Sequence, residues 1–187
     1  MAQRLAHHLF SYAKYLELEK TSGVRHEWLA GQVFAMAGRT PEHARLSARV
    51  VAALVRLAGP TGCEVFTSDL KVRVPATGLA TYPDAAVVCG ELVHASDDPN
   101  AVTNPVLVVE VLSPNTEAYD RGEKLWHYQQ ISSVHAVVFV SQDARRLEIR
   151  QREPDGSWSR EVAEGTGGVL LRELNGQLEV EAVYGAA

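Results

Sequence analysis

The chain has 187 residues, of which 46% are hydrophobic and 22% charged, and its net charge is −5. This length and balance predict one compact domain over residues 1–187 and exclude a disordered chain. No apolar run approaches the roughly 20 residues of a membrane span, and the first residues lack the apolar centre of a secretory signal. We therefore expect no membrane partner. The negative charge argues against coating nucleic acid by bulk electrostatics, but not against an enzyme that engages phosphates locally.

The sequence contains two cysteines, Cys63 and Cys89. They lie far apart along the chain, and they fit neither a disulfide framework nor a CxxC zinc pair. We therefore expect reduced thiols and a cytoplasmic protein.

The N-terminal half alternates between helical and strand patterns. Thr40 is a suitable N-cap and Pro41 suits the first position of a helix, which makes this helix start the clearest. The patterns predict, in chain order, a helix at 11–19, a hairpin at 25–36, a helix from 41 that ends at 59–60, a strand at 63–74, a strand at 82–89 and a surface loop at 90–104.

The C-terminal half begins with an apolar run at 104–113, rich in β-branched residues and typical of a strand buried on both faces. There follow a helix at 116–130, an apolar strand at 134–140, and amphipathic segments at 146–152, 158–163 and 178–183. Asp155-Gly156 predicts a hairpin turn between the first two of these segments. The order is that of a mixed α/β fold, and 104–140 has the length of a crossover between parallel strands.

Glu110 is a lone carboxylate in the middle of the apolar run at 104–113. An ionised carboxylate costs several kcal/mol to bury unless a cation or hydrogen bonds compensate it. A core needs no such residue, so we expect a partner charge or a metal ion beside it.

Two more side chains belong with Glu110. If the strands at 82–89 and 104–113 pair, Asp84 and Glu110 face each other and repel unless a cation shares them. Carboxylate oxygens are the ligands that Mg²⁺ prefers. Asp120, Lys124 and Tyr128 share one helix face, and if that face packs towards Glu110, Lys124 brings a positive charge to a metal-bound water or a phosphate oxygen.

Several motifs occur in an order that resembles a known family. They are Tyr-Pro-Asp at 82–84, Val-Glu-Val-Leu-Ser-Pro at 109–114, Tyr-Asp-Arg-Gly-Glu-Lys at 119–124 with Tyr128, and the landmarks at 25–31, at 37–38 with His43, and at 66–69. Together they resemble the Uma2 family of small bacterial proteins in the PD-(D/E)XK nuclease superfamily. The resemblance covers nearly the whole chain. It implies an α/β, restriction-endonuclease-like core, a mixed β-sheet flanked by helices, here with an N-terminal hairpin and C-terminal β-strands.

The resemblance also implies a Mg²⁺-dependent endonuclease that hydrolyses DNA phosphodiester bonds, with Mn²⁺ able to replace Mg²⁺. Carried over by position, Asp84 and Glu110 are catalytic metal ligands, and the backbone carbonyl of Val111 is a third ligand. The superfamily motif has a lysine two residues after the glutamate, where this chain has Leu112. Lys124, one helix later, is the expected catalytic replacement.

Three further candidates are Glu27, His43 and Tyr128, with Glu27 as an additional acidic residue near the metal. Each has a structural alternative. Glu27 suits an exposed hairpin position, His43 a solvent-facing first helical turn, and Tyr128 simple packing on the sheet.

The principal residues have structural alternatives too. Asp84 fits a turn after proline, Glu110 and Lys124 could form a purely structural buried ion pair, and Lys124 alone could be a solvated partner of Asp120. Asp69 is as well suited to a bulge as to a site.

A group of basic residues could follow a phosphate backbone or form a scattered solvated face. It consists of Arg39, Arg45, Arg49, Lys71 and Arg73.

Two other functions stay open. A catalytically inactive nucleic-acid-binding or dimerisation module of the same fold is the first, and a metabolic α/β enzyme is the second. The second is disfavoured because no Gly-rich phosphate loop or nucleophile elbow occurs. Cutting both DNA strands with one site per chain favours a homodimer.

Overall fold

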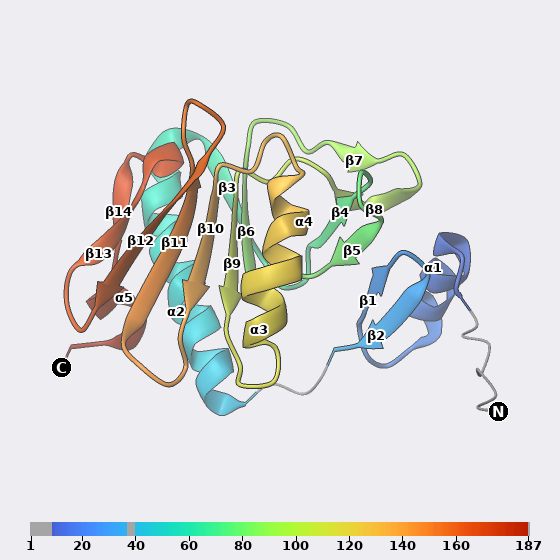
Figure 1. The fold of residues 1–187 in the computed structure, drawn as a ribbon, viewed down its shortest axis with the longest axis horizontal. Coiled ribbons are helices and arrows are strands. Elements are labelled where there is room, and N and C mark those ends of the chain that lie inside the picture. The colour runs from blue at the N-terminus through green and yellow to red at the C-terminus, as the bar shows by residue number, and fades with distance from the viewer. Residues whose placement is uncertain (1–8, 37–39, 187) are drawn as a thin grey trace.

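A computed structural model of the protein describes residues 9–36 and 40–186. It contains two six-stranded mixed sheets, one two-stranded sheet and flanking helices (Figure 1). The expected mixed α/β class, with a mixed β-sheet flanked by helices, is confirmed. No helix in the described residues is both long and apolar enough to cross a membrane.

The central sheet has the strand order β12-β11-β10-β9-β6-β3. Its strands are β3 (Cys63–Thr67), β6 (Ala85–Cys89), β9 (Leu107–Val111), β10 (Ala136–Val140), β11 (Arg146–Arg152) and β12 (Trp158–Glu164). Strands β9 and β10 are parallel, and the other neighbours are antiparallel. The predicted crossover between two apolar parallel strands is therefore confirmed, as is the hairpin of β11 and β12.

Helices cover both faces of the central sheet, so β9 is buried on both sides. Helix α2 (Pro41–Ala58) lies behind the sheet in Figure 1, and the segment α3 (Glu117–Tyr119), η2 (Asp120–Lys124) and α4 (Leu125–Gln129) lies in front. Alternate strand residues face opposite sides. Val109 and Val111 therefore pack in the cluster that contains α2, while Val108 packs with Leu125 and Tyr128. Burying each such apolar side chain contributes about 1.5–3 kcal/mol.

The second sheet has the order β2-β1-β5-β4-β8-β7 and packs beside α1 (Tyr12–Thr21). Its strands are β1 (His26–Leu29), β2 (Gln32–Ala35), β4 (Lys71–Val74), β5 (Leu79–Thr81), β7 (His94–Ala95) and β8 (Asp98–Val102). The predicted hairpin of β1 and β2 is confirmed.

Two predictions fail in this region. Residues 63–74 are not one strand, because β3 belongs to the central sheet and β4 to the second sheet, with a turn at 68–70 between them. Alternation of side chains continues through both strands, so periodicity cannot reveal a change of sheet. Residues 90–104 are not only a loop, since β7 and β8 form within them.

The later elements differ from the sequence expectation in detail. The predicted helix at 116–130 is interrupted by η2, one π-helical turn. The segment at 178–183 divides between the end of a strand and a helical turn. The remaining elements are η1 (Gly59–Thr61), β13 (Gly168–Leu171), η3 (Arg172–Leu174), β14 (Gly176–Glu179) and α5 (Val180–Tyr184).

Cys63 and Cys89 form a disulfide, which contradicts the expectation of free thiols. Strands β3 and β6 are antiparallel, and their register sets these two residues directly opposite each other. Their Cα atoms lie 4.1 Å apart. Separation along the chain says nothing about this register. The cysteines therefore no longer support a reduced compartment.

Candidate active site

A cavity of about 710 Å³ opens where the central sheet meets the hairpin of β1 and β2. Its walls come from that hairpin, the start of α2, the end of β9, the loop after β9, and η2. Asp84, Glu110 and Lys124 all line it, together with Glu27 and His43. The structure therefore brings together the principal site residues and two of the three further candidates.

Strand pairing brings Asp84 close to Glu110. Ala85 pairs with Val109, and continuing this antiparallel register by one residue sets Asp84 opposite Glu110. Both side chains are buried. Asp84 Oδ2 accepts a 2.7 Å hydrogen bond from the N–H of Val111 and lies 3.2 Å from His43 Nε2. Asp84 is therefore fixed by the neighbouring strand rather than being a free turn residue.

Lys124 forms ion pairs with three carboxylates. Its Nζ lies 2.9 Å from Glu110 Oε1, 2.9 Å from Glu27 Oε1 and 3.6 Å from Asp120 Oδ1. The hydroxyl of Tyr128 donates a 2.6 Å hydrogen bond to Glu110 Oε1. Lys124 and Asp120 are buried, so a solvated surface pair is wrong. Tyr128 does more than pack on the sheet, because it holds one oxygen of Glu110.

Burial and charge work against each other in this cluster. Burial raises the pKa of Glu110, and the positive charge of Lys124 opposes that rise. Burial likewise raises the pKa of Asp120. Burial alone would lower the pKa of Lys124, but Glu110 and the other nearby acidic groups raise it well above its ordinary value. The acidic groups around Lys124 therefore stabilise its charged form.

The π-helical turn η2 aims Asp120 and Lys124 into the cavity. Tyr128 follows one turn later on α4 and reaches Glu110 from the same side. The single helix face predicted for Asp120, Lys124 and Tyr128 therefore faces Glu110. Single π-helical turns are frequent at functional sites.

Glu27 and His43 are less exposed than their structural alternatives, an exposed hairpin position and a solvent-facing helical turn, predicted. Glu27 on β1 is 13% exposed and accepts a hydrogen bond from the hydroxyl of Thr81. His43 is buried in the first turn of α2, where its backbone N–H donates to Thr40 Oγ1 at 3.1 Å. Asp69, by contrast, is exposed at the turn between β3 and β4, where it pairs with Arg25.

Two of the basic residues proposed as a phosphate track, Lys71 and Arg73, cannot belong to one. Lys71 and Arg73 are buried in the second sheet, where they pair with Asp98 at 2.8 Å and Asp97 at 3.2 Å. A scattered solvated face is therefore wrong for these two residues. Arg39 lies outside the described residues.

The donor set can be compared with what Mg²⁺ requires. Among the described residues, no group of three or more His, Cys, Asp and Glu side chains is arranged to hold a metal ion. Mg²⁺ is commonly held by one or two carboxylates, with waters and substrate phosphate completing the shell. Asp84 and Glu110 supply two hard oxygen donors in a cavity whose carboxylates outnumber its one lysine. The residues present therefore fit a magnesium site of the two-carboxylate kind.

Sequence reasoning missed Gln142. Its Nε2 donates to the carbonyl of Leu112 at 2.6 Å, and its Oε1 accepts from Thr40 Oγ1 at 2.8 Å. The sequence held part of the signal for Gln142. Because β9 and β10 are parallel, the residues that follow both strands lie at the same edge of the sheet. Asp120, which is expected on one helix face with Lys124 and Tyr128, also lines the cavity.

The mixed central sheet, with acidic side chains at the paired ends of β6 and β9, defines a protein of the restriction-endonuclease-like class. Residues 12–182 match the model of the Uma2 family, which is described as "Putative restriction endonuclease". The chain belongs to this family, and the resemblance recognised in its motifs is confirmed.

Two relatives come from Synechocystis sp., and both are described as uncharacterized. The protein slr1290 is 31% identical over 171 residues, covering 91% of this chain and 89% of its own, and sll1609 is 28% identical over 169 residues, covering 90% and 89%. A crystal structure from Anabaena variabilis, described as a "putative nuclease belonging to DUF820", has a TM-score of 0.76 and 12% identity, covering 94% of this chain and 97% of that one. At this identity the likeness shows the fold alone.

Proposed function

We propose that the protein is a Mg²⁺-dependent endonuclease that hydrolyses phosphodiester bonds of DNA. One observation carries the proposal: two buried carboxylates meet at paired strand ends, in a cavity where a buried lysine contacts one of them. The family description, "Putative restriction endonuclease", supports the same class of reaction.

Asp84 and Glu110, with the backbone carbonyl of Val111, would hold the metal ion, and Mn²⁺ would serve in its place. When bound, such an ion polarises the scissile phosphate and lowers the pKa of a coordinated water. The protein's own part is to fix the two carboxylates. The Val111 N–H and His43 hold Asp84, and Tyr128 holds Glu110.

Lys124 replaces the lysine that the superfamily motif has two residues after the glutamate. In this chain that position is Leu112, which is buried in the core cluster shared with Tyr128. Lys124 reaches Glu110 from η2 instead, at 2.9 Å. Its ammonium can donate to a phosphate oxygen and stabilise the charge that develops there, or orient the attacking water.

The test is plasmid nicking by the wild type, Asp84→Asn and Asp69→Asn, each with Mg²⁺ and with EDTA. Asp69→Asn is the matched control, because Asp69 is exposed outside the cavity lining. We expect the wild type and Asp69→Asn to nick only with Mg²⁺, and Asp84→Asn to lose the activity. Nicking by Asp84→Asn at the wild-type rate would end the assignment for this site.

The ion-pair cluster also favours a second candidate, a catalytically inactive nucleic-acid-binding or dimerisation module. Lys124 already contacts three carboxylates, so the cavity has a cation without any metal. A module of this kind binds DNA equally well with Mg²⁺ or EDTA and nicks nothing. Metal titration of DNA binding separates the two candidates. The homodimer remains a prediction, which sedimentation velocity can check.

A further inference from the structure

Four arginines converge on one buried glutamate beside the candidate active site. Glu148 on β11 has a side chain only 1% exposed. Its carboxylate lies 2.7 Å from Arg121 Nη1, 2.9 Å from Arg160 Nη2, 3.0 Å from Arg150 Nε and 3.4 Å from Arg146 Nη2. We call these four side chains the arginine shelf.

One carboxylate cannot neutralise four guanidinium groups. Arg121 forms a second ion pair with Glu117, with 2.7 Å between Arg121 Nε and Glu117 Oε1. Among the described residues, Glu148 is the only carboxylate within ion-pairing distance of Arg146, Arg150 and Arg160. Glu164 is opposite Arg146 in the strand register, without a direct contact. The shelf therefore keeps an excess of positive charge, and like charges this close are unfavourable unless another anion joins them.

The arginines remain accessible although their glutamate is buried. Their side chains are 23% exposed for Arg121, 30% for Arg150, 33% for Arg146 and 47% for Arg160. In Figure 1 the described part of the chain leaves the front of β11 and β12 without a covering helix. A guanidinium has five N–H donors, so one contact to Glu148 leaves donors for a ligand.

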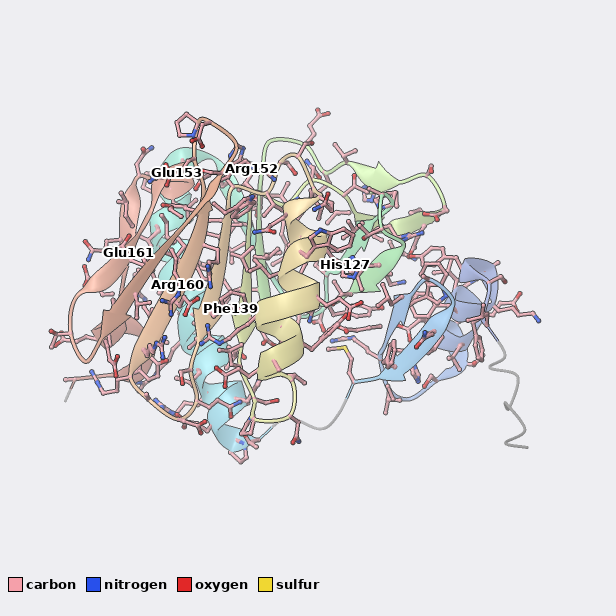
Figure 2. The ribbon with its side chains drawn as sticks, viewed as in Figure 1. His127, Phe139, Arg152, Glu153, Arg160 and Glu161 are labelled. Carbon is pink, nitrogen blue, oxygen red and sulfur yellow. A yellow bond between two sulfur atoms is a disulfide. The ribbon has the colours of Figure 1, made fainter. Side chains whose placement is uncertain are left out.

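The strand register places the shelf on the same face of the sheet as the cavity. Phe139 on β10 pairs with Glu110 on one side and Glu148 on the other, so the three residues form one row across the sheet. The guanidinium of Arg121 lies over the Phe139 ring, 5.3 Å from its centre. Figure 2 labels Phe139 and Arg160 on this part of the sheet. Two strand spacings separate Glu110 from Glu148, roughly 10 Å.

We propose that the arginine shelf binds backbone phosphates of the DNA whose scissile phosphate occupies the cavity. This rests on the proposed function and names how its substrate is held. Successive phosphates of one DNA strand lie at least about 3.4 Å apart, so the shelf contacts the backbone at most about three nucleotides from the cut. Guanidinium groups suit this partner because they bind phosphate oxygens in pairs and stay charged. Glu148 acts as the buried anchor that holds the four groups in place.

The experiment measures binding of a fluorescein-labelled duplex of about 20 base pairs by anisotropy, in EDTA, over a series of salt concentrations. The variants are Arg150→Gln/Arg160→Gln and the single Arg160→Gln. Arg172→Gln is the matched control, since Arg172 is also half exposed and pairs with Glu153 outside the shelf. Arg160→Lys keeps the charge. Thermal unfolding by circular dichroism checks that each variant folds.

We expect the double variant to bind DNA about tenfold or more weakly, and the slope of log K against log salt to fall by about 2. Arg160→Gln should lower the slope by about 1, and Arg172→Gln and Arg160→Lys should keep the wild-type slope. If the double variant does not fold, Arg160→Gln decides the matter, because its side chain is the most exposed of the four.

An unchanged affinity and slope in Arg160→Gln and the double variant would overturn the proposal that the shelf binds DNA. A wild type that fails to bind the duplex would overturn it too. Because EDTA prevents cutting, the result is separate from the nicking assay. A wild type that binds through the shelf but never nicks supports the shelf and contradicts the nuclease. A wild type that nicks DNA but binds it independently of the shelf supports the nuclease and contradicts the shelf.

Discussion

The backbone N–H of Val111 donates a hydrogen bond to the carboxylate of Asp84, 2.7 Å from nitrogen to oxygen. Asp84, one candidate metal ligand, is therefore hydrogen-bonded to the residue that directly follows Glu110, the other candidate ligand. His43 holds the same oxygen of Asp84 from α2. The relative position of the two carboxylates is fixed by backbone pairing, not by flexible side chains, as preorganised metal ligands require.

Replacing Lys124 by Met should abolish nicking and weaken the fold. Lys124 is buried against Glu110 and Glu27, so its loss leaves buried carboxylates without their cation. Removing one partner of a buried ion pair costs about 3–5 kcal/mol of unfolding free energy. Loss of an electrostatic catalytic group lowers the rate by about 100-fold or more. Urea unfolding and plasmid nicking measure the two effects.

Lys14→Met is the control for this substitution, because Lys14 is exposed on α1. It should leave both the unfolding free energy and the nicking rate unchanged. Lys124→Arg keeps the charge and should recover part of the stability. Wild-type nicking by Lys124→Met would remove Lys124 from the reaction.

Replacing Tyr128 by Phe separates packing from positioning. The ring stays in the core, while the 2.6 Å hydrogen bond to Glu110 is lost. A hydrogen bond to a charged group contributes about 1.5–3 kcal/mol, so we expect unfolding to become easier by about that amount. We also expect Mg²⁺ to be needed at a higher concentration for half-maximal nicking. If only stability changes, Tyr128 has a purely structural part.

The sequence predicted those parts of the molecule that depend on local pattern. The apolar runs of β9 and β10 have strong strand character, and the distance between them is that of a crossover, so their parallel pairing followed. Lys124 could be placed because helical spacing puts it on one face with Tyr128, and its contact with Glu110 depends only on which way that face packs.

What depends on register between distant strands could not be predicted. The pairing of Cys63 with Cys89 requires knowing which residues of β3 and β6 are opposite. The same holds for Glu148, whose arginines come from η2, β11 and β12. In the sequence, Glu148 and its arginines are ordinary charged residues on amphipathic segments. Only the folded sheet brings them together.

Reduction of the disulfide should destabilise the protein. Cys63 and Cys89 close a loop with a sequence separation of 26. A cross-link over a loop of this size stabilises by about 3 to 4 kcal/mol, chiefly by restricting the unfolded chain. Urea unfolding with and without dithiothreitol measures the difference. Cys63→Ser/Cys89→Ser should be insensitive to the reductant. Free thiols in the folded wild type, counted under non-reducing conditions, would contradict the pairing.

The arginine shelf makes stability depend on acid pH through Glu148. Burial alone would raise the pKa of Glu148, but Arg160 and Arg121 lower it from an ordinary 4.5 to about 2. A carboxylate with a lower pKa in the folded state stabilises that state above the unfolded pKa, and the contribution disappears as the pH falls towards the folded value. The pKa difference, from 4.5 to about 2, corresponds to at most about 3 to 4 kcal/mol.

Glu148→Gln should therefore be less stable than the wild type at pH 7, and the difference should shrink as the pH falls from 4.5 towards 2. Urea unfolding of both proteins at several pH values measures it. Subtracting the variant cancels the other carboxylates, which titrate in both proteins. Glu164→Gln is the control, because Glu164 is exposed on β12 and makes no ion pair within the described residues. A difference that stays constant down to pH 3 would show that Glu148 stabilises the fold through packing, and that the arginines do not depend on its charge.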